Sequence, residues 1–467
     1  MKRGNTIKII FAGMSLTAFL LGGCSSGNSD GGNSKAEAEK VNVVSADEVL
    51  NGPEIEVTFW HAMGGTNGEA LNKIVEEFNS KNKGHIKVMA QFQGSYDDEL
   101  NKLKSAQMAG QGPNVIQVYD IGTRYMLDSG WAVPVQAFID ADKWDKQQIE
   151  PNLLAYYEID KKLYSMPFNS STPLLYYNKD AFKESGLDPE NPPKTLEDII
   201  AVSDKLKKKD SSGETVRYAY GMYTYGWWFE QLMAKELLPI YDNGNGRDAA
   251  PTKVVFDENG GGAKILKIWN RLIKEDVMPK YAMNSDDCTS AFANGKIAMT
   301  VGSTAGLAST LAAVGDKFEL GTGYFPAVDK ESKGGVSIGG ASLWIMDNQD
   351  DKIERAAWEF IKFAASPEQQ AFWNTKTGYF PITKGAYDQQ LYKDNVAKYP
   401  QFEMAVKQLR ESPAESKGGL CAIYTQARQI VETNITKMLN GEQSEEETLS
   451  AITKSINTAI SDYNLAN

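Results

Sequence analysis

The sequence predicts an α/β protein with two or more lobes, and three observations support that prediction. At 467 residues the chain is too long for a single hydrophobic core. From Glu54 onward, strand patterns alternate with helix patterns, which is typical of a parallel sheet with crossover helices. At the stretch "PFNSSTPLLYYNK" (167–179) this rhythm changes. We therefore expect a second sheet to begin within that stretch.

The elements of the first lobe follow one another in a regular order. "IEVTFWHA" (55–62) alternates apolar and polar residues as a strand does, and apolar residues then recur at helical spacing from Leu71 to Phe78. "HIKVMAQF" (85–92) predicts a second strand, "DDELNKLKSAQMAGQGP" (97–113) a helix that Gly and Pro end, and "NVIQVYD" (114–120) a third strand.

Helices dominate the rest of the chain. Thr195 is placed to cap a helix, the aromatic-rich "YGWWFEQL" (225–232) follows, and "AKILKIWNRLIKE" (263–275) is amphipathic. "KIAMTV" (296–301) and "SIGGASLWIM" (337–346) predict two further strands. In the helical last hundred residues, Ser444 and Glu447 form the pattern of a capping box.

The N-terminus has the pattern of a secretory signal. Basic residues precede the short apolar run "IIFAGMSLTAFLL" (9–21), and "GGC" follows. Leu21–Cys24 resembles the bacterial lipobox, in which the Cys thiol is lipidated after cleavage; the alternative is a signal peptide with an incidental Cys. We expect a signal peptide at 1–23, then lipidated Cys24 and a flexible tether at 24–52, which place the protein on the outer face of the cytoplasmic membrane.

Composition and motifs argue against several functions. The net charge of −12 and the lack of a polybasic arm argue against nucleic acid as partner. There are two histidines, and CxxC, HExxH, GxSxG and Walker-type sequences are all missing. We expect that the protein is not an enzyme and needs no metal or cofactor. A metal or acid–base site built from carboxylates alone stays a possibility. Cys288 and Cys421 are expected to be free buried thiols, with a disulfide as the alternative.

Polar and aromatic residues follow the predicted strands, where ligands of α/β proteins bind. Tyr96, Asp120 and Ser303 are such positions. "GSTAG" (302–306) could bring backbone N–H groups close to an anion, or Ser303 could be an ordinary helix cap; the residues alone leave both open.

Long ordered motifs resemble one family. "VTFWHAMGG", "NVIQVYDIGT", "PFNSSTPLLYYNKDAFKESGLDPENPPKT", "IAMTVGST", "IGGASLW" and "KTGYFPITKGAY" are similar to the glycerol-3-phosphate-binding proteins of Ugp-type ABC importers, within the maltose-binding-like group, from Val57 to the last helices. The resemblance implies a two-lobed periplasmic-binding-protein-like fold, with a ligand cleft between lobes that several segments join. We expect the first lobe at 53–168 and 301–347, and the second at 169–300 and 348–467.

The resemblance also implies a ligand site. Its motifs match the family's phosphate and hydroxyl contacts at Tyr96, Ser171, Ser303, Gly340, Tyr379 and Arg428. Asp120 stands where the family has Glu, and Trp227 matches one of two pocket tryptophans. The other tryptophan position is Thr224, between Tyr223 and Tyr225. The missing tryptophan predicts that the ligand pocket is open at the end that would hold a head group, unless a neighbouring tyrosine fills the space.

The implied function is a monomeric, lipid-anchored receptor that delivers glycerol-3-phosphate or a glycerophosphodiester such as glycerophosphocholine to the transmembrane subunits of an ABC importer. Two alternatives stay open. An oligosaccharide receptor is favoured if Trp60, Trp227, Trp228 and Tyr225 stack on sugar rings, and a secreted phosphodiesterase would require a catalytic group that the motifs do not show.

Overall fold

The computed structural model describes residues 41–279 and 283–466. The expected signal peptide, Cys24 and most of the expected tether lie outside these residues. Within the described part of the chain, no helix combines the length and apolarity that a membrane crossing requires.

The last residues of the expected tether, from residue 41 onward, are folded. Helix α1 (Ala46–Leu50) packs against α14 (Asp351–Ala364), and Val49 is fully buried there. Val43 and Val44 pack against the same core. The prediction of a flexible segment up to residue 52 is therefore wrong from residue 41 onward: the apolar side chains of this segment are covered by the core rather than exposed to solvent.

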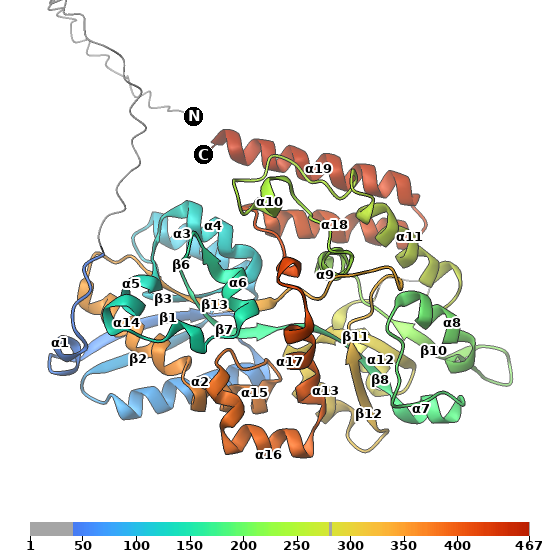
Figure 1. Ribbon diagram of the computed structural model, residues 1–467, viewed down its shortest axis with the longest axis horizontal. Coiled ribbons are helices and arrows are strands. Elements are labelled where there is room, and N and C mark those ends of the chain that lie inside the picture. Colours follow the sequence, from blue (N-terminus) through green and yellow to red (C-terminus); the bar gives the residue numbers. More distant parts are fainter. Residues whose placement is uncertain (1–40, 280–282, 467) are drawn as a thin grey trace, which may run out of the picture. The chain divides into compact units, whose positions relative to one another are not determined.

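The first sheet contains the strands predicted at the start of the chain and lies at the left of Figure 1. β1 pairs in parallel with both β2 and β3, as the alternating pattern predicts, whereas β13 pairs antiparallel with β3, β4 and β7. In spatial order the strands are β2 (Ile86–Phe92), β1 (Ile55–His61), β3 (Val115–Tyr119), β13 (Gly339–Met346) and β4 (Ala132–Val133), with β7 (Met166–Ser171) also on β13.

The second sheet lies at the right of Figure 1. β10 and β11 are parallel, and the other pairs are antiparallel. In spatial order its strands are β12 (Leu320–Tyr324), β8 (Pro173–Asn178), β11 (Ile297–Ser303), β10 (Thr215–Gly221) and β9 (Lys208–Lys209). β5 (Glu158–Ile159) and β6 (Lys162–Leu163) form a separate hairpin.

The stretch "PFNSSTPLLYYNK" joins the two sheets. β7 ends at Ser171 in the first sheet and β8 begins at Pro173 in the second, so Thr172 is the single residue between them. Thr172 is held by Thr304: its N–H donates to the Thr304 hydroxyl (3.2 Å), and the Thr304 N–H donates to its carbonyl (3.0 Å). The cluster of small polar residues is therefore a crossing between sheets, as the sequence predicts.

The other points at which the chain changes sheets differ from those expected near residues 300 and 346. β12 pairs with β8 of the second sheet, so the return to the first sheet falls between Tyr324 and Gly339. After Met346 the chain stays with the first sheet, because the apolar face of α14 covers β1 and β13. The Phe59 and Phe360 rings, for example, lie 5.3 Å apart.

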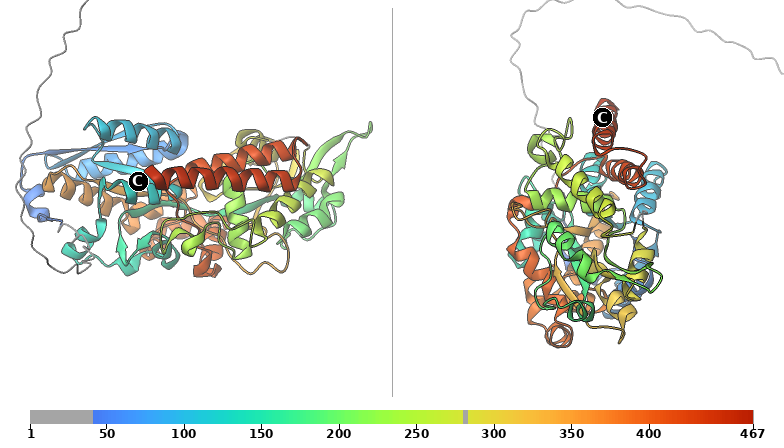
Figure 2. Two further views of the ribbon diagram at one scale, coloured as in Figure 1. Left: turned by 90° about the horizontal axis from the view of Figure 1, so that it is seen from above. Right: turned by 90° about the vertical axis from the view of Figure 1, so that its right-hand side faces the viewer.

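Helices cover both sheets, and the last two, α18 and α19, lie side by side (Figures 1 and 2). Those packed with the first sheet include α2 (Gly65–Lys81), α3 (Tyr96–Met108), α4 (Thr123–Ser129), α5 (Val135–Asp142), α6 (Pro151–Tyr157), α14 and α15 (Pro367–Thr377), with α16 (Gln390–Lys398) on α15. The remaining helices are α7 (Lys179–Glu184), α8 (Leu196–Leu206), α9 (Gly226–Glu236), α10 (Asp242–Gly246), α11 (Gly261–Lys274), α12 (Ser285–Ala293), α13 (Leu307–Val314), α17 (Gln401–Glu411), α18 (Tyr424–Leu439) and α19 (Glu445–Ala466).

Candidate ligand-binding site

A cavity of about 200 Å³ lies where strand ends of both sheets meet. It is bounded by the residue after β3, the end of β7, the end of β11 and the start of β13. The described lining residues are Tyr96, Tyr119, Asp120, Ser171, Tyr223, Tyr225, Trp227, Ser303, Ala305, Gly339, Gly340, Tyr379 and Arg428. Eight of the nine ligand positions that the sequence implies are thus brought together, and Thr224 is the exception. Their ligand contacts stay a prediction.

Arg428 lies buried in the wall of this cavity, on α18. Its Nε and Nη2 donate to the two carboxylate oxygens of Glu230 at 2.8 and 2.7 Å, and its Nη1 donates to the Tyr225 hydroxyl at 3.2 Å. Burial alone would lower the pKa of Arg428, but the adjacent Glu230 carboxylate outweighs it and raises the pKa well above its usual value. The guanidinium therefore stays charged, in a fixed orientation and with N–H groups to spare.

Acidic groups surround this single cation. Burial raises the pKa of Asp120 to about 7, although Arg428 acts in the opposite direction. Glu432 accepts a hydrogen bond from the Gly226 N–H (2.9 Å), and burial raises its pKa too. Arg428 is the one basic side chain among the described lining residues, and Glu230 already neutralises it. The site therefore has little positive charge left for a ligand with several negative charges.

A chain of buried hydrogen bonds positions the tyrosines at the first-sheet wall. The Gln117 amide donates to the Asn169 Oδ1 (2.7 Å), and the Asn169 amide donates to the Tyr96 hydroxyl (2.8 Å). The Tyr379 hydroxyl joins the same group. Tyr96 also stacks on Tyr119, with ring centroids 5.0 Å apart. Asn169 of "PFNSST" thus holds two cavity-lining hydroxyls in place.

Two glycines let the strands and Trp227 approach closely. Gly340 has φ +91°, and a Cβ there would lie 1.9 Å from the Asn169 carbonyl oxygen. A Cβ on Gly339 would lie 2.6 Å from the Trp227 ring. Any larger residue would push apart the walls that β7, β13 and α9 form.

Of the two roles that the sequence left open for this turn, the structure shows the helix cap. The Ser303 hydroxyl accepts from the Ala305 N–H (3.2 Å) as the cap of a short 3₁₀ helix, Thr304–Gly306, and Ser303 also lines the cavity. The Ala305 N–H is thus occupied by the cap, and a ligand contact of the Ser303 hydroxyl stays a prediction.

Thr224 lies outside the cavity lining, contrary to the position expected from the family motif. Its N–H donates to the Met283 carbonyl (3.2 Å), and its buried hydroxyl has no partner among the described residues. Tyr223 and Tyr225 line the cavity instead, stacked with ring centroids 5.9 Å apart. The alternative that neighbouring tyrosines fill the gap is therefore the one the structure supports.

Sequence reasoning missed Glu230 and Tyr119. Glu230 is 198 residues from Arg428, and no local pattern shows that α9 and α18 pack together. Its place one turn after Trp227 on the predicted helix was the available signal, because residues three apart share a helix face.

The tryptophans that an oligosaccharide site would use are dispersed. Trp228 is fully buried and stacks on Phe325, and the Trp60 indole donates to Gln91 (2.9 Å). Of the four residues proposed to stack on sugar rings, two line the cavity, namely Trp227 and Tyr225.

The described cavity lining contains neither histidine nor cysteine. Burial lowers the pKa of His61 to about 4, and His61 does not line the cavity. In the described part of the chain, no three His, Cys, Asp or Glu residues are placed to hold a metal ion. Cys288 and Cys421 are free and buried, as predicted.

A larger hollow of about 530 Å³ lies beside the edge strand β12. Lysines 179, 194 and 407 and Glu190 and Glu411 are among its lining residues. It contains none of the positions that the sequence implies, so we place the candidate site at Arg428.

Fold and site together define a class of protein. The family model described as bacterial extracellular solute-binding protein matches residues 73–403, and the chain belongs to that family. It is 35% identical over 402 residues to the sn-glycerol-3-phosphate-binding periplasmic protein UgpB of Escherichia coli K12, covering 84% of this chain and 90% of that protein. It is also 35% identical over 404 residues to UgpB of Pectobacterium atrosepticum, covering 84% of this chain and 88% of that protein.

Solved structures share the fold. UgpB from Mycobacterium tuberculosis, in complex with glycerophosphocholine, matches with a TM-score of 0.73 at 20% identity, over 88% of this chain and 99% of that one. The cyclic alpha-maltosyl-1,6-maltose binding protein from Arthrobacter globiformis matches with a TM-score of 0.70 at 24% identity, over 88% and 100%. The predicted two-lobed solute-binding fold is thereby confirmed.

We predict that Asp120 makes stability depend on pH. Its folded pKa of about 7 lies above the ordinary value of about 3.9. Between these values the folded state binds more protons than the unfolded state, so this group's contribution to the free energy of unfolding falls as pH rises. Relative to the unmodified protein, Asp120→Asn should therefore gain stability between pH 4.5 and pH 7.5, measured by urea unfolding. A stability difference that is the same at both pH values would contradict this.

Proposed function

We propose that the protein is the substrate-binding component of an ABC importer and that its ligand is a glycerol phosphate, with a glycerophosphodiester preferred over the monoester. The observation that supports this most directly is the buried Arg428 guanidinium at a small cavity lined by hydroxyl groups. A guanidinium with neighbouring hydroxyls is the donor set that a phosphate requires. The 35% identity to glycerol-3-phosphate-binding proteins supports the same ligand class.

The charge balance supports the diester. A phosphate monoester carries about −1.5 to −2 at pH 7, whereas a diester carries one negative charge. Glu230 already offsets Arg428, and Asp120 with its pKa of about 7 is partly ionised at neutral pH. The second negative charge of a monoester would therefore be repelled without a cation to offset it. An uncharged diol end would donate to Asp120, while Trp227 packs against the carbon chain.

In this proposal, the protein binds and releases its ligand without converting it chemically. The lobes close on the ligand by hinge motion at the crossings, of which Thr172 is the shortest. Ser171, Ser303, Tyr96 and Tyr379 supply hydroxyl contacts, and Gly340 permits close approach.

We predict that Arg428→Ala weakens glycerophosphocholine binding a hundredfold or more. A desolvated charge contact of this kind is worth about 2–5 kcal/mol, and about 1.4 kcal/mol corresponds to a factor of ten. Calorimetric titration measures the loss. Because the single variant leaves Glu230 unpaired, the double variant Arg428→Ala/Glu230→Ala tests whether the loss persists with both charges removed.

Arg410→Ala is the matched control. Arg410 also contacts both oxygens of a carboxylate, that of Glu150, at 2.6 and 3.4 Å, but it lies outside the cavity. This variant should change affinity less than twofold. A loss below about threefold in Arg428→Ala, with the fold retained by circular dichroism, would remove Arg428 from the site.

We also propose that a lipid on Cys24 holds the mature protein on the outer face of the cytoplasmic membrane. Several acyl chains on one residue give stable attachment, at about 0.8 kcal/mol for each buried methylene. Cys24→Ala should leave uncleaved precursor or release the protein to the medium, as membrane fractionation and the mass of the N-terminal peptide would reveal. An unchanged fractionation pattern and an unchanged N-terminal mass would overturn the anchor.

A further inference from the structure

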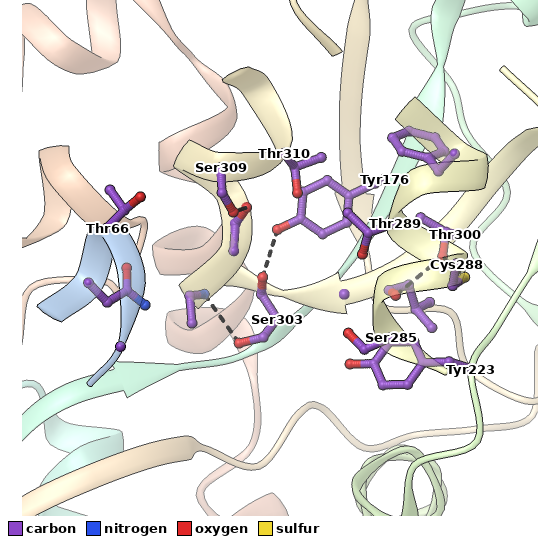
Figure 3. A pocket seen from close by; sticks show the side chains of 17 residues that line it. Thr66, Tyr176, Tyr223, Ser285, Cys288, Thr289, Thr300, Ser303, Ser309 and Thr310 are labelled. Carbon is purple, nitrogen blue, oxygen red and sulfur yellow. Dashed lines mark hydrogen bonds between the residues drawn. The ribbon is translucent and has the colours of Figure 1, made fainter. Parts of the chain in front are cut away.

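A second hollow of about 380 Å³ adjoins the Arg428 cavity. The two share Tyr223, Ser303 and Ala305 in their walls, so they lie next to each other. Thr66 and Asn67, at the start of α2, line it from the side of the first sheet, and residues of β11, α12 and α13 line it from the side of the second. Figure 3 shows the hydroxyl-bearing side chains from these elements around the hollow.

The lining of this hollow combines hydroxyl-bearing side chains with apolar ones such as Phe292 and Val301, and it is uncharged. Among the described residues, no Asp, Glu, Lys, Arg or His side chain lines it. Much of the wall consists of hydroxyl groups, such as those of Tyr176, Ser285 and Ser309. The Tyr176 hydroxyl donates to the Ser303 carbonyl (2.8 Å), which leaves its oxygen free to accept.

Four of the polar side chains have hydrogen-bonding capacity to spare. Thr66 and Asn67 on one side, and Thr289 and Thr310 on the other, make no side-chain hydrogen bond within the described part of the chain. Each hydroxyl is one donor and an acceptor, and the amide offers two donors and an acceptor. Donors and acceptors thus face the hollow from both lobes, at the volume typical of a small-molecule pocket, which starts at about 300 Å³.

We infer that this hollow receives the second alcohol of a glycerophosphodiester, and that it selects an uncharged polyol such as glycerol or inositol. The inference rests on the proposed function, because the phosphate at Arg428 is what places the second alcohol here. A polyol pairs with hydroxyls and amide from both walls. A choline head group has no hydrogen-bonding atom to offer them, and the described lining has no carboxylate to attract its charge.

The hollow also supplies the space that the sequence assigned to Thr224. Tyr223 and Tyr225 close that side of the cavity, so a head group would instead occupy the hollow that shares Ser303 and Tyr223 with it. A polyol that bridges Thr66 and Thr289 contacts both lobes. Its binding energy would therefore favour the closed state directly.

The test compares four ligands by calorimetry: glycerol-3-phosphate, glycerophosphocholine, glycerophosphoglycerol and glycerophosphoinositol. The unmodified protein should bind the two polyol diesters about tenfold or more tighter than glycerophosphocholine, since each net hydrogen bond contributes a factor of a few. The double variant Thr66→Val/Thr289→Val should lose about tenfold for the polyol diesters and less than twofold for the other two ligands. Both residues are exposed, so the fold should tolerate the changes.

Two further variants separate the hollow from general effects. Ser309→Trp fills the hollow from an exposed position and should also weaken the polyol diesters selectively. Thr458 is exposed on α19 and lies outside both cavities, so Thr458→Val should leave the affinity for all four ligands unchanged. The inference would be overturned if the variants of the hollow lost affinity equally for all four ligands, or if their affinity for the polyol diesters did not change. If glycerol-3-phosphate binds and the polyol diesters bind no better than glycerophosphocholine, the inference alone fails; if none of the four binds, the proposed function fails with it.

Discussion

The ion pair between Arg428 and Glu230 is the interaction on which the cavity depends. It joins α18 to α9, and the exposed fraction of either side chain is 10% or less. Removing one partner of such a pair costs about 3–5 kcal/mol, because the other charge is left buried and unpaired. Paired, the guanidinium keeps one orientation without a ligand. In the proposed function, a phosphate would meet a donor that is already in place, and less binding energy would be lost to ordering a side chain.

In the proposed function, the same pair also determines which anion the site prefers. Because Glu230 neutralises Arg428 and Asp120 adds partial negative charge, the donors favour an anion with a single charge over one with two. The hydroxyls that complete the site come from both sheets, and the one-residue crossing at Thr172 brings Ser171 beside the end of β11. Charge balance and topology thus lead to one ligand class.

The sequence predicted the elements whose patterns are local. The period-two and helical spacings between Ile55 and Tyr119 correspond to three parallel strands and two helices. Tyr96, Asp120 and Ser303 could be proposed from their places after predicted strands. The other five cavity positions were located through long family motifs, because residues such as Tyr379 and Arg428 have no local pattern in common. The Glu230 partner could not be predicted, since it depends on the packing of two helices distant in sequence.

The errors have physical causes of the same kind. β12, "LGTGY", contains two glycines and lacks an apolar run, so it was not recognised as a strand and the return crossing was placed too early. Gly321 is nevertheless required there, since a Cβ would lie 2.2 Å from the Tyr177 ring. Thr224 was placed in the site by its alignment with a tryptophan. Its backbone instead bonds to Met283, and its tyrosine neighbours form the wall.

We infer that a neutralised arginine, where strand ends of both sheets meet, selects a singly charged glycerophosphodiester. Calorimetric titration of the unmodified protein at pH 7 with glycerophosphocholine, glycerol-3-phosphate and maltose tests it most directly. We expect glycerophosphocholine to bind at least as tightly as glycerol-3-phosphate, and maltose not to bind. Binding of maltose without binding of either phosphate, or a clear preference for the monoester, would contradict it.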